Sequence, residues 1–434
     1  MNTLVLDRRL SSSEKITHSV HEMLGERRGN WRALLGLVGP GVVVSVAYMD
    51  PGNFVTNIQA GAQYNYSLLW VVVLASATAV LFQMLSAKLG VVTGHNLAEL
   101  SREHLPPALV LGMWLASEVA AMATDLAELL GGALGVSLLC HVPLLPGLII
   151  TAAITCAMLL LGNRGFRPLE LAIGVLVGAI GMAYAAELFL SPVAWSGVFK
   201  GLVGHELPDA NALNLAVGIV GATVMPHTLY LHSGLTQARV PVRTDAERTK
   251  LVTFTHREVG ITLALAGFVN VAMIIASASA FHDHHANVSD IQDAYRILGP
   301  AMGAAAAGLF LVALISSGIS SSVVGTMAGQ VIVQGFVKWR IPLWFRRAIT
   351  MLPSFFVVGA GINPTKALLS SQVILSLTLS LPMLALVWLT GRRDVMGVHR
   401  NRPRLQGVAW AATAAVLVLN ATWVLQAFGI NAVR

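Results

Sequence analysis

The segment Asp50-Pro51-Gly52-Asn53 interrupts an apolar stretch that runs from residue 34 to residue 62. A carboxylate at membrane depth is costly, so an acidic residue in such a stretch predicts a functional site. Pro51 removes a backbone donor and Gly52 loosens the helix, which frees carbonyl groups that another group must satisfy. A carboxylate, an amide and free carbonyls at one point are typical of a cation site. We therefore expect a broken helix with a bound cation here.

Apolar runs long enough to cross a bilayer recur along the whole chain, which predicts an all-α membrane protein. Hydrophobic residues make up 55% of the sequence and charged residues 11%, whereas a soluble domain carries about 25% charged residues. We expect about eleven transmembrane helices, of which the eighth is long enough to contain a bend. Their approximate ranges are 36–62, 67–92, 108–139, 144–162, 168–190, 212–237, 257–281, 300–335, 343–360, 366–389 and 406–428.

Lys and Arg are unequally divided between alternate connections, and this asymmetry predicts the orientation in the membrane. Of the 28 Lys and Arg residues, 24 fall in one set of connections, which begins with the N-terminal tail. The other set holds only Lys200, Arg296, Lys366 and Arg434. The positive-inside rule therefore predicts a cytoplasmic tail over 1–35 and an external C-terminus. The net charge of +7 follows from this asymmetry and requires no nucleic-acid partner.

Several common motifs are absent from the sequence. The first 30 residues have no apolar core, so a cleavable signal peptide is not expected. Cys140 and Cys156 form no disulfide framework or metal-thiolate pattern, and no zinc-protease motif, Walker loop or dinucleotide fingerprint appears. We therefore expect neither an ATP-driven pump nor an enzyme, and no prosthetic group.

A second interruption lies in the sixth predicted span, where Gly221 and Pro226 divide the apolar run. Pro226 follows Pro51 by 175 residues, which is five spans. An odd offset gives equivalent elements opposite orientations, so the pattern predicts two inverted five-helix repeats over about 36–190 and 212–389. A basic loop and an eleventh helix over 390–434 would follow. Paired breaks in corresponding spans indicate a transporter site near the bilayer midplane.

The donor atoms at the two breaks indicate which cations would bind. Asp50 and Asn53 offer oxygen ligands, and unwinding exposes backbone carbonyls near Ala47 and Ala222. Met225 adds a thioether beside Pro226, unless it only fills space in the core. Magnesium and calcium take oxygen ligands, whereas sulfur donors favour transition metals. The combination favours manganese, iron, cobalt or cadmium as the transported ion.

These two motifs resemble the signatures of the Nramp family of proton-coupled divalent-metal transporters, specifically its bacterial manganese-transporting branch. Asp50-Pro51-Gly52-Asn53 and Met225-Pro226-His227 carry the resemblance, with the segment 122–128 and Ser371-Gln372 in support. It implies a broken-helix inverted-repeat fold in the inner membrane of a bacterium, with no obligatory oligomeric partner. The implied ligands are Asp50, Asn53 and Met225, the carbonyls of Ala47 and Ala222 and, in some conformations, Gln372.

Ionisable residues in the third span are candidates for proton transfer. Glu118, Asp125 and Glu128 fall within an arc of about 80° on one helical face, and each would need a partner at membrane depth. Arg346 and Arg347 can pair with them or act only as positive charges that set the topology. The family resemblance implies a proton route from Asp50 past Asp125 and Glu128 towards the inside.

Histidines are weaker candidates for the same role. His227 follows the second break and can titrate near neutral pH, or it can simply cap exposed backbone. His232 is weaker still. The external run His282-Asp283-His284-His285 suggests metal recruitment by composition only. Glu170 and Glu187, near opposite ends of the fifth span, are expected to be exposed at the membrane interface.

Two other classes of membrane protein remain open from the residues alone. A sodium- or proton-coupled amino-acid symporter has a similar broken-helix architecture, but Asp50 would repel the substrate carboxylate. A channel is disfavoured because two breaks at one depth indicate a gated site. The leading interpretation is a secondary active importer of divalent metal ions, with protons as the coupling ion.

Overall fold

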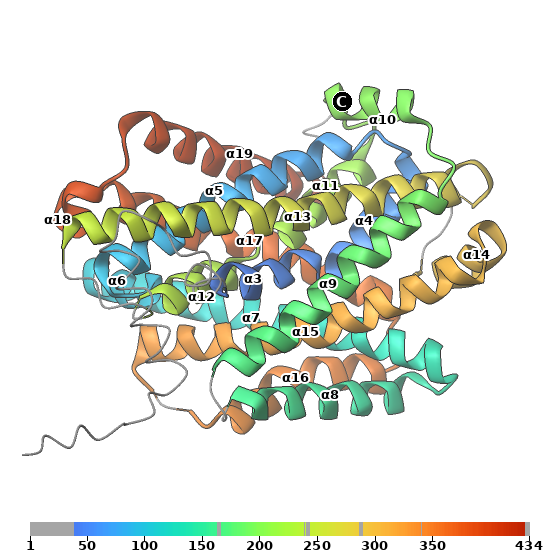
Figure 1. Ribbon diagram of the computed structural model, residues 1–434, viewed down its shortest axis with the longest axis horizontal. Helices are drawn as coiled ribbons and strands as arrows, with labels where there is room; N and C mark the ends of the chain where they lie inside the picture. Colours follow the sequence, from blue (N-terminus) through green and yellow to red (C-terminus); the bar gives the residue numbers. More distant parts are fainter. Residues whose placement is uncertain are drawn as a thin grey trace, which may run out of the picture.

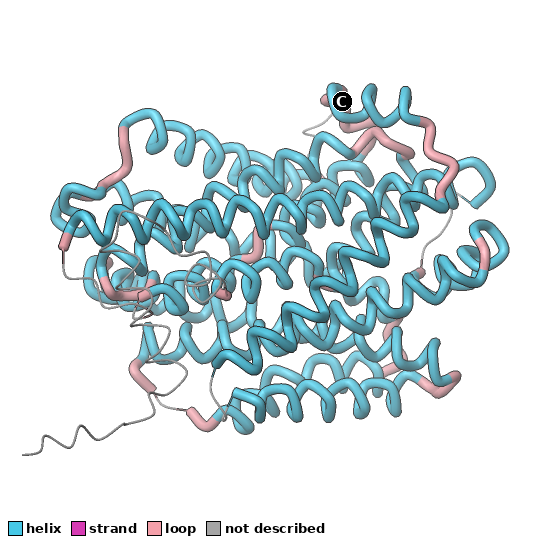
Figure 2. The backbone as a smooth tube through the Cα atoms, in the orientation of Figure 1, coloured by secondary structure: helices cyan, strands magenta, loops and turns pink. Residues whose placement is uncertain are grey.

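The computed structural model describes residues 39–162, 166–237, 239, 244–285, 290–339 and 341–429. Every regular element in these ranges is helical, and most long helices run along one axis of the molecule (Figures 1 and 2). The predicted tail over 1–35 lies outside the described residues. The helices are α3 (Pro40–Ser45), η1 (Val46–Met49), α4 (Pro51–Tyr64), α5 (Leu69–Thr93), α6 (Leu97–His104), α7 (Pro107–Cys140), α8 (Leu144–Leu161), α9 (Phe166–Leu190), α10 (Trp195–Val203), α11 (Ala210–Thr223), α12 (Pro226–Thr236), α13 (Asp245–His285), α14 (Ile291–Met302), α15 (Ala304–Val337), α16 (Leu343–Gly359), α17 (Pro364–Gly391), α18 (Arg393–Met396), η3 (Gly397–His399) and α19 (Pro403–Ala427).

In the described ranges, nine helical segments are long and apolar enough to cross a membrane, with α11 and α12 counted as one. The other two predicted spans correspond to shorter elements. Residues Pro40–Met49 form a short apolar piece before the first break, and α16 is 17 residues long. The number of eleven spans therefore stays a prediction. Most of the eighth run is one continuous helix, α15, and the chain bends only near the start of the run, at Gly303, whose φ is +95°.

Both predicted helix breaks are present. Asp50 is extended, with φ −75° and ψ 167°, and Pro51 occupies the first turn of α4. Met225 is likewise extended, with φ −77° and ψ 128°, and Pro226 occupies the first turn of α12. Proline is favoured at this position because its fixed φ suits the helix and its missing N–H would be unpaired there. Each proline therefore ends one half-helix and starts the next.

The packing of the helices repeats after five spans. The second half of the first broken span, α4, packs on α13, as α12 packs on α5. The first half, α3, packs on α9, as α11 packs on α17. Likewise α15 packs on α9 as α17 packs on α7, and the equivalent helices α7 and α15 lie against each other. This pairing is what two inverted five-helix repeats require.

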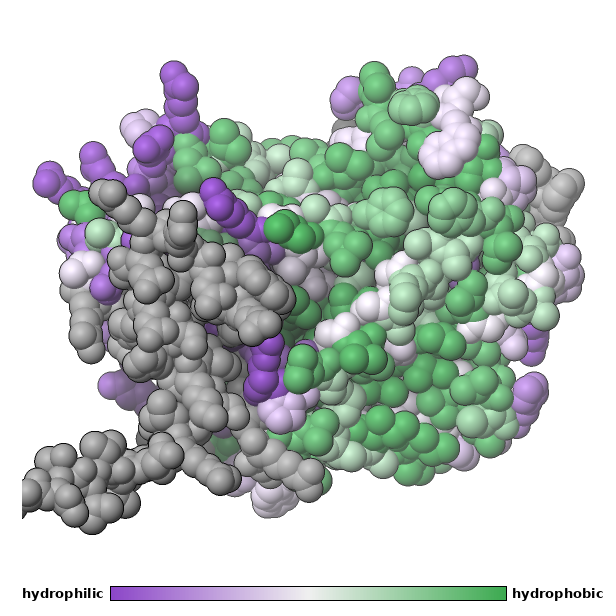
Figure 3. Space-filling model, in the orientation of Figure 1, coloured by the Kyte–Doolittle hydropathy of each residue, from purple (hydrophilic) through white to green (hydrophobic). Residues whose placement is uncertain are grey.

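The surface matches a protein that crosses a bilayer. Figure 3 shows a face that is mainly hydrophobic across its middle, with hydrophilic residues gathered towards its two ends. The short helices α6 and α18 lie at one end of the long axis, and α10 and α14 lie at the other (Figure 1). The helix breaks are inside the bundle, where the largest fully buried side chains include Tyr48, Phe54 and Tyr230.

Candidate metal centre

Asp50 lies at the first break with its carboxylate fully buried. Its oxygens accept hydrogen bonds from the backbone N–H groups of Gly52, at 3.1 Å, and Asn53, at 2.9 Å. The Asn53 side-chain amide donates to the same carboxylate at 2.7 Å. Among the described residues no Lys, Arg or His forms an ion pair with Asp50. A buried carboxylate held only by N–H donors attracts a cation.

Asn53 connects the two breaks. Its side-chain nitrogen donates to the backbone carbonyl of Ala222 at 3.0 Å, and its side-chain oxygen accepts from the Thr223 hydroxyl at 3.2 Å. Asn53 is in the first turn of α4, whereas Ala222 and Thr223 form the end of α11. The two half-helices therefore meet at the carboxylate, and the freed carbonyl of Ala222 points at a donor that a metal ion can replace.

The carbonyls freed at the first break are largely satisfied by other helices. Asn270 of α13 donates to the carbonyl of Tyr48 at 2.8 Å, and Ser317 of α15 donates to that of Met49 at 2.6 Å. Ala47 precedes them in η1 and is fully buried. These bonds hold the unwound backbone in place without water, as a membrane interior requires.

Met225 and Gln372 complete the predicted ligand set. Met225 is fully buried at the start of α12, where its carbonyl accepts from the Thr228 hydroxyl at 2.7 Å. Gln372 of α17 lies directly over the first break, because a Cβ on Gly52 would be 2.2 Å from its side-chain nitrogen. Its side-chain oxygen is buried and has no hydrogen-bond partner in the described part of the chain. That oxygen is available to a metal ion.

The site is poor in charge. Across the described ranges, no three His, Cys, Asp or Glu side chains are clustered in a way that could hold a metal. The structure instead bonds Asp50 to Asn53 and Asn53 to Ala222, with Gln372 against Gly52, so one anionic group lies among neutral candidate ligands. Hard divalent ions held by the protein alone usually have several carboxylates. One carboxylate with neutral donors suits an ion that is bound and released.

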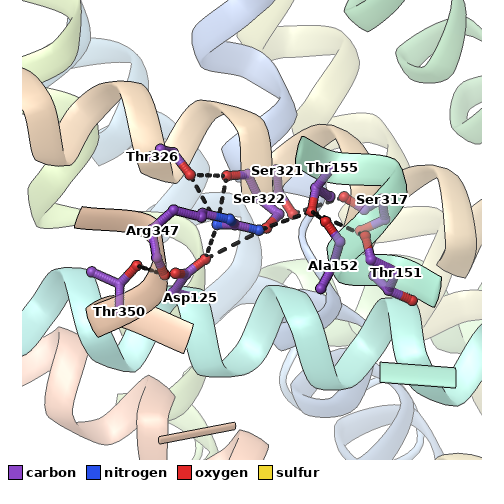
Figure 4. A network of polar contacts seen from close by, with 10 residues as sticks. All are labelled: Asp125, Thr151, Ala152, Thr155, Ser317, Ser321, Ser322, Thr326, Arg347 and Thr350. Carbon is purple, nitrogen blue, oxygen red and sulfur yellow. Dashed lines mark hydrogen bonds and ion pairs between the residues drawn. The ribbon is translucent and has the colours of Figure 1, made fainter. Parts of the chain in front are cut away.

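The carboxylates of α7 face the arginines of α16. Arg346 donates both terminal nitrogens to Glu118, at 3.2 and 3.3 Å. Arg347 pairs with Asp125 inside the bundle, and the side chains of this pair are 3% and 5% exposed. Figure 4 shows Arg347 also reaching Ser322, Thr326 and Thr155. Both arginines therefore pair with the third-span carboxylates, beyond any effect on topology.

Glu128 lies one turn beyond Asp125 and is fully buried. Glu128 forms no ion pair among the described residues, and the hydrogen-bonding side chain beside it is Ser321. It interacts electrostatically with Asp50, Asp125 and Arg347. Glu128 is thus coupled both to the candidate metal ligand and to the buried ion pair.

The chain is similar to known proteins over almost its whole length. A family model described as "Natural resistance-associated macrophage protein-like" matches residues 41–426. The chain belongs to the Nramp family. Its relatives include the divalent metal cation transporter MntH of Verminephrobacter eiseniae, 59% identical over 96% of this chain and 95% of the relative. The divalent metal cation transporter MntH of Deinococcus radiodurans is 46% identical over 90% of this chain and 89% of the relative.

Solved structures agree with this assignment. A manganese transporter of Eremococcus coleocola aligns with a TM-score of 0.83 and 32% identity, over 94% of this Nramp chain and 90% of that one. Mhp1, a nucleobase-cation-symport-1 family transporter, aligns with a TM-score of 0.60 at 12% identity. The second likeness concerns the fold alone.

The two predicted histidines of this Nramp protein belong to one polar region. His227 shares a hydrogen bond with the Thr124 hydroxyl at 3.1 Å through Nδ1. His232 contacts the side-chain oxygen of Gln83 at 2.7 Å through Nδ1. Gln83 in turn donates to the hydroxyls of Tyr48, at 2.6 Å, and Thr228, at 2.8 Å. Sequence reasoning missed Gln83, although a glutamine inside an apolar span is itself a signal.

One expectation about the fifth span was wrong. Glu170 and Glu187 are 5% and 3% exposed, so interfacial exposure does not account for them. Glu170 is paired with Arg167 at 3.0 Å and with Arg239, which follows α12, at 2.8 Å. The His282 side chain contacts the Ala62 carbonyl at 3.0 Å; the side chains of the predicted run from Asp283 to His285 lie outside the described residues.

Proposed function

We propose that this protein is a secondary active importer of divalent transition-metal ions, manganese foremost, with iron, cobalt and cadmium as further substrates and protons as the coupling ion. The observation that carries the proposal is the buried Asp50 carboxylate at the junction of two broken helices, bridged by Asn53 to the Ala222 carbonyl. The buried Met225 beside this junction supports a transition metal, since thioethers favour such ions over magnesium and calcium.

An amino-acid symporter is a poorer match for this site. In that class a half-helix N-terminus receives the carboxylate of the substrate. Here the N–H groups of Gly52 and Asn53, at the start of α4, are already occupied by the Asp50 carboxylate. A substrate anion would have to displace Asp50 and would meet its charge. A cation is attracted by the same arrangement.

The proton route that we propose leads from Asp50 through Glu128 to the Asp125–Arg347 pair and then to Glu118 and Arg346. A divalent ion at Asp50 expels any proton held there, because metal binding requires the deprotonated carboxylate. Glu128 is the next acceptor, since it is a buried carboxylate that interacts electrostatically with Asp50 and forms no ion pair among the described residues. His227 and His232 border the route at the second break.

Metal uptake into proteoliposomes tests the proposal. Manganese uptake should be stimulated by an inward proton gradient, and cadmium should compete with it better than magnesium or calcium. Internal pH followed in the same vesicles should fall when manganese enters. Uptake that ignores the proton gradient would refute coupling, and uptake of an amino acid in place of metal would refute the substrate class.

We further propose the orientation, lipid environment and repeat boundaries given by the sequence. The N-terminus would be cytoplasmic in the inner membrane of a bacterium, with repeats over about 36–190 and 212–389. Native Cys140 and Cys156 are exposed, so they must first be replaced. Cysteines placed at Lys200 and Arg243 should then label from opposite sides of intact cells, the former from outside. Labelling of both from one side would refute this topology.

A further inference from the structure

A cavity of about 240 Å³ lies between α5, α11 and α19. Trp70 and Ala75 of α5, Val220 and Val224 of α11 and Ala412 of α19 are among its lining residues. Apart from the Thr78 hydroxyl and the Trp70 indole N–H, the lining side chains are hydrocarbon. Water gains too few partners in such a space, whereas an engineered apolar cavity of about 150 Å³ already binds benzene. The cavity therefore suits an apolar ligand.

The cavity has the shape of a slot along the membrane normal. On α5 its lining runs from Trp70 to Thr78 and on α11 from Ala216 to Val224. Eight residues of helix rise about 12 Å at 1.5 Å per residue. One leaflet of the hydrocarbon core is about 15 Å deep, half of roughly 30 Å. The slot therefore extends over most of one leaflet, from Trp70 near the start of α5 to Val224 at the second helix break.

The slot communicates with the lipid-facing surface. Leu74 at its edge is 55% exposed. A second, open hollow continues along α19 past Ala415 and Val418, and α19 is largely uncovered by the rest of the protein. In a bilayer this surface is in contact with acyl chains, so their supply requires no other partner. Alanines at 411, 412, 414 and 415 keep α19 thin enough to leave the hollow open.

Trp70, at one end of the slot, indicates how the ligand is oriented. The indole N–H of Trp70 is buried and has no hydrogen-bond partner among the described residues. Trp70 lies in the first turn of α5, on the side of α10 and the α11 start, and its ring is next to that of His205. The ester carbonyl of a phospholipid, at the interface between head group and chain, is an acceptor of the right kind at the right depth.

We propose that this slot binds one ester-linked acyl chain of a membrane phospholipid, with the ester at Trp70 and the chain end at Val224. Val224 is fully buried and immediately precedes Met225. The bound chain therefore supports the back of α11 at the helix break. The inference concerns lipid contact and does not depend on which ion the protein transports.

Quenching of tryptophan fluorescence by brominated lipid tests this site. The full-length protein is reconstituted into vesicles of phosphatidylcholine with plain or dibrominated chains, and the contribution of Trp70 is obtained by subtracting the Trp70→Phe spectrum. We expect the Trp70 contribution to lose more than half its intensity in brominated vesicles. Ala412→Phe, which fills the slot, should restore it. Ala421→Phe, on an exposed part of α19 outside the slot, should not.

Native mass spectrometry in mild detergent provides a second readout if a variant folds poorly. Wild type and Ala421→Phe should retain one phospholipid that Ala412→Phe, or Ala415→Phe as a substitute, releases. Absence of Trp70 quenching would overturn the proposal. Equal quenching in wild type and the filled variant would assign the contact to lipids around the protein, and would also overturn it. Neither result would bear on metal transport.

Discussion

Removing Arg347 should destabilise the protein more than any other single change in the proposed proton route. The Arg347 and Asp125 side chains are 3% and 5% exposed, and Arg347 also donates to Thr326 at 2.8 Å and Thr155 at 3.0 Å. Breaking a buried ion pair costs about 3–5 kcal/mol because one charge stays buried alone. After Arg347→Met, Asp125 would keep only a hydrogen bond from Ser322 at 3.5 Å.

A double-mutant cycle separates the ion pair from the rest of the arginine. Asp125→Asn added to Arg347→Met removes the uncompensated charge, so the double variant should be more stable than Arg347→Met alone by about 1–3 kcal/mol. Chemical unfolding in detergent micelles measures this coupling. In vesicles, Asp125→Asn should reduce metal-stimulated proton entry more than metal binding.

Arg346→Met is the matched control. Arg346 is 5% exposed but its partner Glu118 is 21% exposed, so solvent screens this pair more and breaking it should cost less than breaking the Arg347–Asp125 pair. Equal stability of Arg347→Met and Arg346→Met would refute the argument from burial. No coupling in the cycle would mean that Asp125 and Arg347 act independently. Equal loss of metal and proton flux in Asp125→Asn would assign Asp125 to the metal site or to folding.

Four further variants test the metal centre, each by uptake and competition assays in vesicles. Asp50→Asn should fold, because asparagine caps a helix as well as aspartate does, yet transport should fall to background; near-normal manganese uptake would rule out Asp50 as the ligand. Met225→Ala should retain manganese uptake at reduced efficiency while calcium begins to compete, and an unchanged competition profile would make Met225 merely core. Gly221→Ala should abolish uptake, since its Cβ would be 2.0 Å from a backbone oxygen of α17. Gly52→Ala meets only the flexible Gln372 side chain and should slow uptake less. A larger loss of uptake in Gly52→Ala than in Gly221→Ala would contradict this packing.

Much of the fold could be predicted from the sequence because the bilayer restricts the possibilities. Apolar runs of sufficient length fix most spans, and prolines at 51 and 226 mark the breaks through a local covalent property of the residue. The short spans were harder to establish. The break at Asp50 leaves only Pro40–Met49 before it in the described residues, and α16, Leu343–Gly359, is only 17 residues long although its bounds match the predicted range of 343–360.

The parts of the site that depend on contacts between distant helices could not be predicted from the sequence. Asn53 was predicted as a metal ligand, but its bond to Ala222 depends on how α4 meets α11. Gln83 is separated from His232 by 149 residues, and only folding brings them to 2.7 Å. Glu187 was expected at the interface because polar residues near the end of a span usually lie there. The packing of α13 and α15 over α9 buries it instead.

The two halves of the first broken span are fastened separately, which explains how a fully buried site can open to one side at a time. At the start of α3, Glu258 accepts from the N–H groups of Gly39, at 2.8 Å, and Gly41, at 2.9 Å. At the far end of α4, Tyr64 donates to Asp209 at 2.6 Å. Only the extended Asp50 joins α3–η1 to α4. Since no helical hydrogen bond connects the two described half-helices across Asp50, α3 can leave Glu258 while Tyr64 stays bound to Asp209. Equally, Tyr64 can leave Asp209 while α3 stays bound to Glu258. The proposed metal ligand would thus also be the hinge, and we expect an ion that draws Asp50 towards Ala222 and Gln372 to change which fastening is easier to release.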